Sequence, residues 1–269
     1  MLNNNRKRGS STGKSIFLSE EEFRNLRVVV IPKAKFVPSY CIERDKFWKE
    51  VVSEGIKVGK KFWNGTIYAL ESLDFKGGSP SRLVLTTIEY KDFLLENVNG
   101  RNWIVKNFGR ESFYKNCWVS VLPITSDGKI VCGLKKSSEI VWPERIAYIS
   151  GGLNQDETKV KDTLCIREHA YKEFIEETNV LKIQKGLTSD DLFFSQIIIC
   201  KSHVEFQFMV KLEISSRDVD KLNCRGEFKL FVAFSKDELL KFKGKILPEF
   251  KRMIAQVRKG THPILRFRR

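Results

Sequence analysis

The feature that most constrains this chain is a run of nine residues, Lys172 to Val180, which reads Lys-Glu-Phe-Ile-Glu-Glu-Thr-Asn-Val. In a helix, Glu173, Glu176 and Glu177 have the i, i+3, i+4 spacing that places side chains side by side on one face. Like charges so arranged repel one another, and a hard cation that prefers oxygen ligands, such as Mg²⁺, is the simplest means of stabilising them. The run therefore predicts a helix with a metal-binding face.

The opposite side of the same helix is expected to be buried. It carries an apolar stripe at helical spacing, made of Val160, Leu164, Tyr171, Phe174 and Ile175. Such a stripe is typical of a helix that packs on a sheet. The alternative is an ordinary amphipathic surface helix whose acidic face is solvated.

Together with a glycine upstream, the run resembles the Nudix box, whose pattern is Gly, five residues, Glu, seven residues and then Arg-Glu-apolar-x-Glu-Glu-x-Gly-apolar. The last nine positions match closely. By this resemblance the leading glycine is Gly152, and the metal-binding glutamates are Glu173, Glu176 and Glu177. The resemblance implies an α+β fold, namely a Nudix α/β/α sandwich with a mixed sheet.

Three positions depart from the pattern. Lys172 stands where the family has Arg, and a lysine cannot grip a carboxylate with two parallel hydrogen bonds. Asn179 stands where the family has Gly, a mild change because Asn also adopts the left-handed conformation that ends helices. Leu164 occupies the position of the outer glutamate, which is therefore missing or displaced. The nearby acids, none of which we assign to that role, are Asp156, Glu157, Asp162 and Glu168.

A β-hairpin is expected before the box, as the resemblance implies. Asp127-Gly128 is a strong two-residue turn signal between the apolar runs 118–125 and 130–134.

Three further strands are expected after the box, at residues 193–200, 204–214 and 227–234, which are rich in Ile, Val and Phe. Ser235 is then a good N-cap for a helix. Many Nudix proteins have an acidic residue just before the equivalent of the last strand, close to the metal site, and Glu227 is the match. A glutamate on an exposed strand edge is the alternative.

The N-terminal part is similar to the leader region of UDP-glucose-pyrophosphatase-like Nudix proteins. This similarity lies in the aromatic and apolar segments 62–70, 83–87 and 90–94, which predict a small β-rich unit ahead of the catalytic domain. We therefore expect a flexible basic leader at 1–18, an N-terminal β-rich subdomain at 19–114, the Nudix domain at 115–260 and a basic C-terminal tail at 261–269.

The resemblance implies Mg²⁺-dependent hydrolysis, with Mn²⁺ as an alternative metal. The substrate would be a nucleoside diphosphate linked to another moiety, as in an NDP-sugar, and the products a nucleoside monophosphate and a phosphorylated moiety. Glu177 and Glu227 are the candidates for the general base. Residues expected to contact substrate or support the site are Gly151, Gly152, Lys172 and Arg167.

A different class of function is a Nudix-fold module that has lost catalysis and binds nucleotide or RNA, and a third possibility is hydrolysis at an RNA 5′ end. The formal net charge of +15 favours anionic ligands in general. Basic residues concentrate at both ends, in 5–8 and 266–269, where they would suit nucleic acid.

Six scattered cysteines without a Cys-x-x-Cys pair indicate reduced thiols. The chain shows no apolar run of membrane-spanning length and no hydrophobic signal segment, so we expect a cytoplasmic protein with no membrane partner. The sequence does not specify an oligomeric state.

Overall fold

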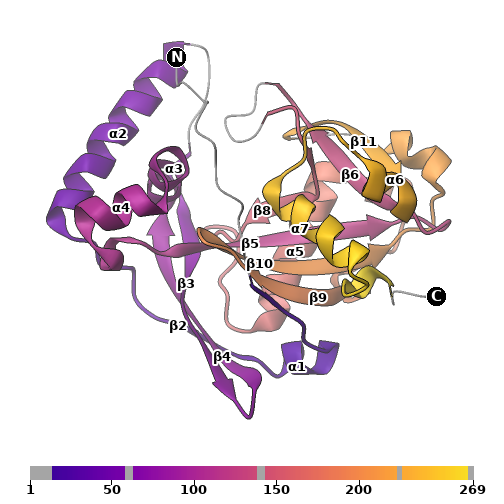
Figure 1. Ribbon diagram of the computed structural model, residues 1–269, viewed down its shortest axis with the longest axis horizontal. Helices are drawn as coiled ribbons and strands as arrows, with labels where there is room; N and C mark the ends of the chain where they lie inside the picture. Colours follow the sequence, from indigo (N-terminus) through magenta and orange to yellow (C-terminus); the bar gives the residue numbers. More distant parts are fainter. Residues whose placement is uncertain (1–13, 58–62, 138–142, 223–225, 266–269) are drawn as a thin grey trace.

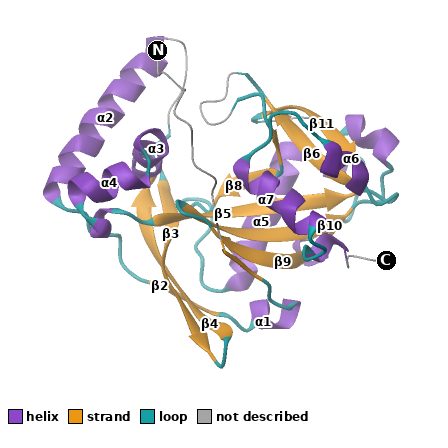
Figure 2. Cartoon of the chain, viewed as in Figure 1, coloured by secondary structure: helices purple, strands orange, loops and turns teal. Residues whose placement is uncertain are grey.

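The computed structural model describes residues 14–57, 63–137, 143–222 and 226–265. Within these residues the strands form one mixed sheet of eleven strands, with helices on both of its faces (Figures 1 and 2). The main path of the sheet runs β1 (Lys14–Ile16), β9 (Leu192–Ile199), β10 (His203–Lys211), β5 (Lys115–Ile124), β3 (Thr66–Lys76), β4 (Ser79–Glu89) and β2 (Arg27–Val30).

A shorter branch leaves the main path at β5. It contains β6 (Ile130–Lys135), β7 (Ile146–Ala147), β8 (Ile149–Gly152) and β11 (Phe228–Phe234). β6 pairs with β11, β7 and the end of β5, and β8 pairs with β5. The pairs β5/β10 and β2/β4 are parallel and the other pairs are antiparallel, so the sheet is mixed as expected.

The α-helices are α1 (Glu20–Arg24), α2 (Pro38–Lys57), α3 (Tyr90–Asn99), α4 (Arg101–Phe108), α5 (Thr163–Thr178), α6 (Lys236–Lys241) and α7 (Pro248–Arg258). Short 3₁₀ helices are η1 (Arg110–Ser112), η2 (Val180–Lys182), η3 (Ser189–Asp191), η4 (Ser216–Lys221) and η5 (Pro263–Leu265).

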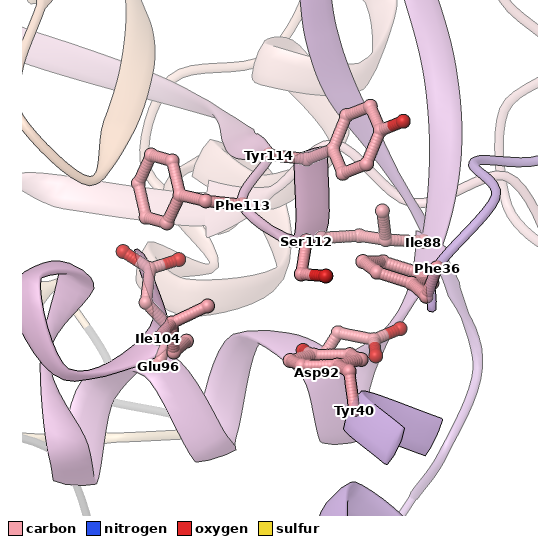
Figure 3. Close-up of a pocket in the computed structure, with 9 residues that line it drawn as sticks. All are labelled: Phe36, Tyr40, Ile88, Asp92, Glu96, Ile104, Ser112, Phe113 and Tyr114. Carbon is pink, nitrogen blue, oxygen red and sulfur yellow. The ribbon is translucent and has the colours of Figure 1, made fainter. Parts of the chain in front are cut away.

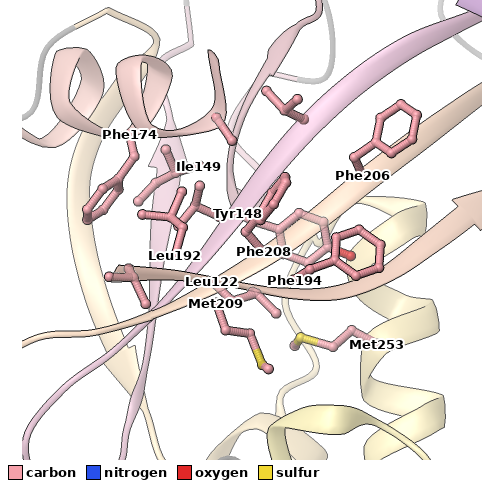
Figure 4. Packing of buried hydrophobic residues seen from close by; sticks show 14 of the residues in the cluster. Leu122, Tyr148, Ile149, Phe174, Leu192, Phe194, Phe206, Phe208, Met209 and Met253 are labelled. Atoms are coloured by element: carbon pink, nitrogen blue, oxygen red, sulfur yellow. The ribbon is translucent and has the colours of Figure 1, made fainter. Parts of the chain in front are cut away.

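Two helices cover opposite faces of the central strands. Phe174 of α5 is fully buried on one face, whereas Met253 of α7 packs on the other, with β5 and β10 between them (Figure 4). Alternation along β10 produces the two cores, because Phe206 and Phe208 point to one side and Met209 to the other. The expected three-layer arrangement is therefore present.

The predicted elements around the box are confirmed with small changes in bounds. Gly128 takes the left-handed conformation, with φ of 80°, in the turn between β5 and β6. Only Ile124 and Ile130 pair across this turn, because β6 then diverges from β5 to pair with β11. Ser235 caps α6, with a hydrogen bond from the backbone N–H of Glu238 to its hydroxyl.

The N-terminal segment 19–114 contains more helix than the sequence predicted. The expected strands are β3 and β4, but residues 90–94 begin helix α3, and α2 and α4 were not predicted. Its strands are also continuous with the main sheet, since Ala69 and Leu70 of β3 pair with the start of β5. The segment therefore extends the sheet of the domain that follows it.

Parts of both predicted tails lie among the described residues. Lys14 to Ile16 form an edge strand on β9, so the ordered chain begins before residue 19. At the other end, His262 is buried and lies 3.1 Å from the side-chain oxygen of Gln207. The basic clusters 5–8 and 266–269 lie outside the described residues.

Candidate functional site

The helix that carries the glutamates, α5, has defined ends. The carboxylate of Asp162 accepts a hydrogen bond from the backbone N–H of Cys165 and caps the first turn. Asn179 ends the helix in the left-handed conformation, with φ of 52°, which confirms the role expected of Asn in place of Gly. The helix thus spans the second half of the sequence pattern.

The buried stripe of α5 is displaced from the predicted one. Leu164 is 49% exposed, so its assignment to the buried stripe was wrong. Val160 is buried as predicted, but it lies before the helix begins. Phe174 is buried as predicted, and it is joined by Ile166 and Ala170, one residue from each preceding turn. The prediction failed because it extended the helical period into a segment that is not helical.

The three glutamates of the run differ in exposure. The Glu173 side chain is 19% exposed and Glu177 is buried, whereas the Glu176 side chain is 58% exposed. Glu176 also lies 3.8 Å from the ammonium of Lys172. The predicted acidic face is therefore divided: Glu173 and Glu177 face the sheet, and Glu176 faces solvent.

Gly151 provides the space that Glu173 occupies. A Cβ atom at Gly151 would lie 2.2 Å from the carboxylate carbon of Glu173, so the carboxylate would have to move from its present position. At Gly152 the nearest atom to such a Cβ would be 4.0 Å away. The glycine that this site requires is Gly151, one residue before the glycine assigned from sequence.

Taking Gly151 as the leading glycine also changes which residue corresponds to the outer glutamate of the pattern. Glu157 follows Gly151 by six positions, as the pattern requires, and the extra residues lie between Glu157 and α5. Glu157 accepts a hydrogen bond from Lys172 at 2.7 Å. Partial burial opposes its ionisation, but the hydrogen bond and charge of Lys172 outweigh burial and hold the pKa of Glu157 below its usual value. The structure therefore places the carboxylate of Glu157 beside Lys172 of the glutamate helix, although the two residues are farther apart in sequence than the pattern requires.

The loop that carries Glu157 is fastened to the N-terminal segment. Asn154 and Ile67 form an isolated antiparallel bridge, and the backbone N–H of Gln155 donates to the carbonyl of Thr66 at 2.8 Å. Strand β3 thus supports one wall of the acidic site.

His169 fixes the other side of this loop. Its Nε2 lies 2.9 Å from the carbonyl oxygen of Gly152 and its Nδ1 lies 2.9 Å from the hydroxyl of Thr158. A carbonyl only accepts, so Nε2 carries the proton and Nδ1 accepts from Thr158. Ligand atoms of Glu157, His169 and Glu173 lie within 4.8 Å of one another, but this tautomer leaves no free nitrogen lone pair for a metal. Burial lowers the pKa of His169, in keeping with a neutral ring that positions the loop.

Glu227 joins the site from the start of β11. Its Oε2 accepts a hydrogen bond from Lys135, a buried residue at the end of β6, at 2.7 Å. The next residue, Lys136, donates its backbone N–H to the Glu227 carbonyl at 2.8 Å. The charge of Glu227 acts on Glu173 and Glu177 of α5, and Lys135 is a neighbour that was not predicted from the sequence.

The buried carboxylates repel one another. Burial and the charges of Glu157, Glu176 and Glu227 raise the pKa of Glu173 to about 7. Burial, followed by the charges of Glu227 and Glu173, also raises the pKa of Glu177 well above its usual value, against the opposing charge of Lys135. Without a counter-ion the fold thus holds these groups at an electrostatic cost.

Arg167 lies outside this cluster. It is 2% exposed and forms an ion pair with Glu20 of α1. Glu20 also accepts a hydrogen bond from the backbone N–H of Phe194 in β9 at 2.9 Å. The geometry therefore gives Arg167 a structural role, the second of the two roles expected from the sequence.

The donor set fits a hard divalent cation. Oε2 of Glu177 and Oε1 of Glu227 are both buried and lack a hydrogen-bond partner among the described residues. Carboxylate oxygens are the ligands that Mg²⁺ and Mn²⁺ prefer. The carboxylates available to hold one or more such ions are Glu157 and Glu173, whose oxygens lie within 4.8 Å of one another, and Glu177 and Glu227, which carry the unpartnered oxygens. The predicted ligand Glu176 faces solvent instead.

Sequence reasoning found most of this site but not all of it. Glu157 was named without a role, because the longer segment before α5 hid its distance from Gly151. The pairing of β6 with β11 brings Lys135 to Glu227 across 92 positions of sequence, and no local pattern signals it. Within the described residues, no helix is both long and apolar enough to cross a bilayer.

No protein-family model matches the sequence, and curated protein sequences give no match. Solved structures similar to this chain include a MutT protein from Methanosarcina mazei Go1, at 12% identity and a TM-score of 0.37, covering 54% of this chain and 94% of that one. A NUDIX-family hydrolase from Clostridium perfringens has 18% identity and a TM-score of 0.33, covering 53% and 95%.

A third similar structure is the NUDIX domain of Shewanella oneidensis NrtR, which was solved with ADP ribose. It has 10% identity and a TM-score of 0.38, and the match covers 60% of this chain and 97% of that chain. These scores are low, so the chemistry assigned to this chain rests on the geometry of its own acidic site.

Proposed function

We propose that this chain is a Nudix-type pyrophosphohydrolase that uses Mg²⁺ or Mn²⁺. The observation that carries the proposal is the convergence of carboxylates from three separate segments: the loop of Glu157, helix α5 and the start of β11. Two of their buried oxygens have no hydrogen-bond partner in the described part of the chain, and the mutual repulsion of the carboxylates favours a bound cation.

The proposed substrate is a nucleoside diphosphate linked to another moiety, such as an NDP-sugar. Water would add across the diphosphate bond to give a nucleoside monophosphate and a phosphorylated moiety. When bound, a divalent cation would neutralise charge on the phosphoryl oxygens and lower the pKa of the attacking water.

The chain's own residues have separable roles in this proposal. Gly151 leaves room for Glu173, and Lys172 fixes Glu157 at the edge of the cluster. Glu177 and Glu227 are the candidates for accepting the proton of the attacking water. Lys135 holds Glu227 in place for either role.

A hydrolase is favoured over a module that has lost catalysis because the apparent defects of the sequence pattern are compensated. Glu157 supplies the outer carboxylate, and Lys172 makes with it an ion pair at 2.7 Å. No contact of the described residues specifically supports RNA binding, since the basic ends lie outside them.

The test is to incubate the purified protein with NDP-sugars, dinucleotides and capped RNA, with and without Mg²⁺, and to identify products by mass. We expect metal-dependent release of a nucleoside monophosphate from one class. In Glu177→Gln, turnover should fall by about 10²- to 10⁴-fold, because a group that positions or activates the nucleophile is lost.

Glu168→Gln is the matched control, because Glu168 lies on the same helix and is exposed. It should keep wild-type turnover. Failure to cleave any class of substrate, or full activity in Glu177→Gln, would exclude the proposed reaction.

A further inference from the structure

A small pocket in the N-terminal segment is separate from the acidic site on α5. Rings of Phe36, Tyr40, Phe113 and Tyr114 line it, and the carboxylates of Asp92 and Glu96 enter it from α3 (Figure 3). The space suits one group of about the size of a water molecule.

The two carboxylates of the pocket lie one helical turn apart and differ in their partners. Asp92 accepts hydrogen bonds from the guanidinium of Arg44 at 3.0 Å and from the backbone N–H of Glu89 at 2.8 Å. Glu96 is only 6% exposed, and its Oε1 has no hydrogen-bond partner among the described residues. In the pocket, Asp92 therefore has hydrogen-bond donors and a counter-charge, whereas Oε1 of Glu96 has no donor among the described residues.

The two basic residues whose charges act on Glu96 do not neutralise its carboxylate. Burial raises the pKa of Glu96 well above its usual value, and the charges of Arg101 and Lys115 oppose this only in part. The guanidinium of Arg101 instead lies over the ring of Phe113, 5.0 Å from its centroid. A buried carboxylate without a partner is costly, and a cation beside it would remove that cost.

The walls restrict what this cation can be. Aromatic faces attract cations, and ammonium groups bind to such faces in proteins. Mg²⁺ usually keeps several of its waters when it binds a protein, and the pocket has space for only one water-sized group. We propose that the pocket binds a water-sized ammonium group, either the ammonium ion or the head of a small primary amine, with Glu96 as its counter-ion.

The experiment measures thermal unfolding of the full chain at mildly alkaline pH and constant ionic strength. The probes are ammonium chloride, methylammonium chloride, potassium chloride and tetramethylammonium chloride, each compared with sodium chloride. At about ten times its Kd, a probe shifts the folding equilibrium about elevenfold, which raises Tm by about 3–6 °C for a chain of this size. We expect this rise with ammonium and methylammonium only.

Glu96→Gln keeps the size of the side chain and removes its charge, so the rise should be lost. The matched control is Glu111→Gln, which removes the same charge from an exposed position close in sequence. It should respond as the wild type does. A rise with ammonium but not methylammonium would restrict the ligand to the free ion.

Three results would overturn the proposal: no rise with either ammonium probe, an equal rise with potassium, or an equal rise with the bulkier tetramethylammonium. If Glu96→Gln does not fold, the comparison of ammonium with potassium and with tetramethylammonium in the wild type tests the proposal.

Discussion

At the scale of single residues, the site depends on the lack of a side chain at Gly151 as much as on the carboxylates themselves. The carboxylate of Glu173 occupies the space where a Cβ of Gly151 would stand. The glycine pair was recognisable from the sequence, but which glycine is required was not, because that depends on the approach of a helix twenty residues later.

Gly151→Ala should therefore displace Glu173 and lower turnover by about 10²-fold, the effect of moving a reacting or positioning group by about 1 Å. Gly152→Ala is the control, since its nearest neighbour would be 4.0 Å away. Steady-state kinetics of both variants would check this. Equal losses in the two would show that the clash at Gly151 is not what matters.

The raised pKa of Glu173, about 7, predicts how stability changes with pH in the metal-free protein. Between about pH 5 and 7 the folded carboxyl keeps a proton that the unfolded one has lost, so the contribution of Glu173 to the free energy of unfolding falls as pH rises. The histidines, whose pKa is lowered by burial, contribute with the opposite sign. The full effect is at most about 3 kcal/mol.

Glu173→Gln should reduce this slope, although Glu177 contributes in the same direction. Urea unfolding at several pH values measures it, with Glu168→Gln as a control that should keep the wild-type slope. The same change of stability with pH in Glu173→Gln and in the wild type would contradict the prediction.

At the scale of elements, the pairing of β6 with β11 completes the cluster. The hydrophobic patterns predicted both strands, and they predicted the presence of α5 and its left-handed end. They did not predict that β6 leaves β5 after one pair, and this divergence brings Lys135 to Glu227.

Lys135→Met should destabilise the metal-free protein by about 1–3 kcal/mol, because Glu227 would lose its one described hydrogen-bond partner on the side chain. Added Mn²⁺ should then stabilise the variant more than the wild type, since a positive charge is restored next to the carboxylates. Urea unfolding with and without Mn²⁺ measures both effects. Lys229→Met, at an exposed position of β11, should behave as the wild type.

If Mn²⁺ stabilised Lys135→Met and the wild type equally, the ammonium of Lys135 would not be part of the charge balance of the site.

At the scale of the whole molecule, contacts between distant segments determine the architecture. Glu20 of α1 holds the buried guanidinium of Arg167 in α5 and the backbone of β9 at once. The capping of α1 was predictable from local residues, as was the presence of strands in the N-terminal segment. Helix α2, and the junction of β3 with β5, were not, because their packing partners are far away in the chain.

Glu20→Gln should lower the free energy of unfolding by about 1–3 kcal/mol, because a buried guanidinium would lose its counter-charge while Glu20 itself remains partly exposed. Chemical denaturation would measure this. Glu21→Gln, an exposed neighbour, should have little effect, and an equal loss there would point to general surface charge instead.

The bridge between Ile67 and Asn154 also affects the order in which parts of the protein fold. The loop that carries Glu157 pairs with a strand that lies 87 positions earlier in the sequence (Ile67 to Asn154). Helix α5 can therefore form before this loop is in place and before the acidic site is complete. Non-local contacts of this kind form late and slowly. During refolding, helical signal should therefore recover before tight divalent-cation binding does.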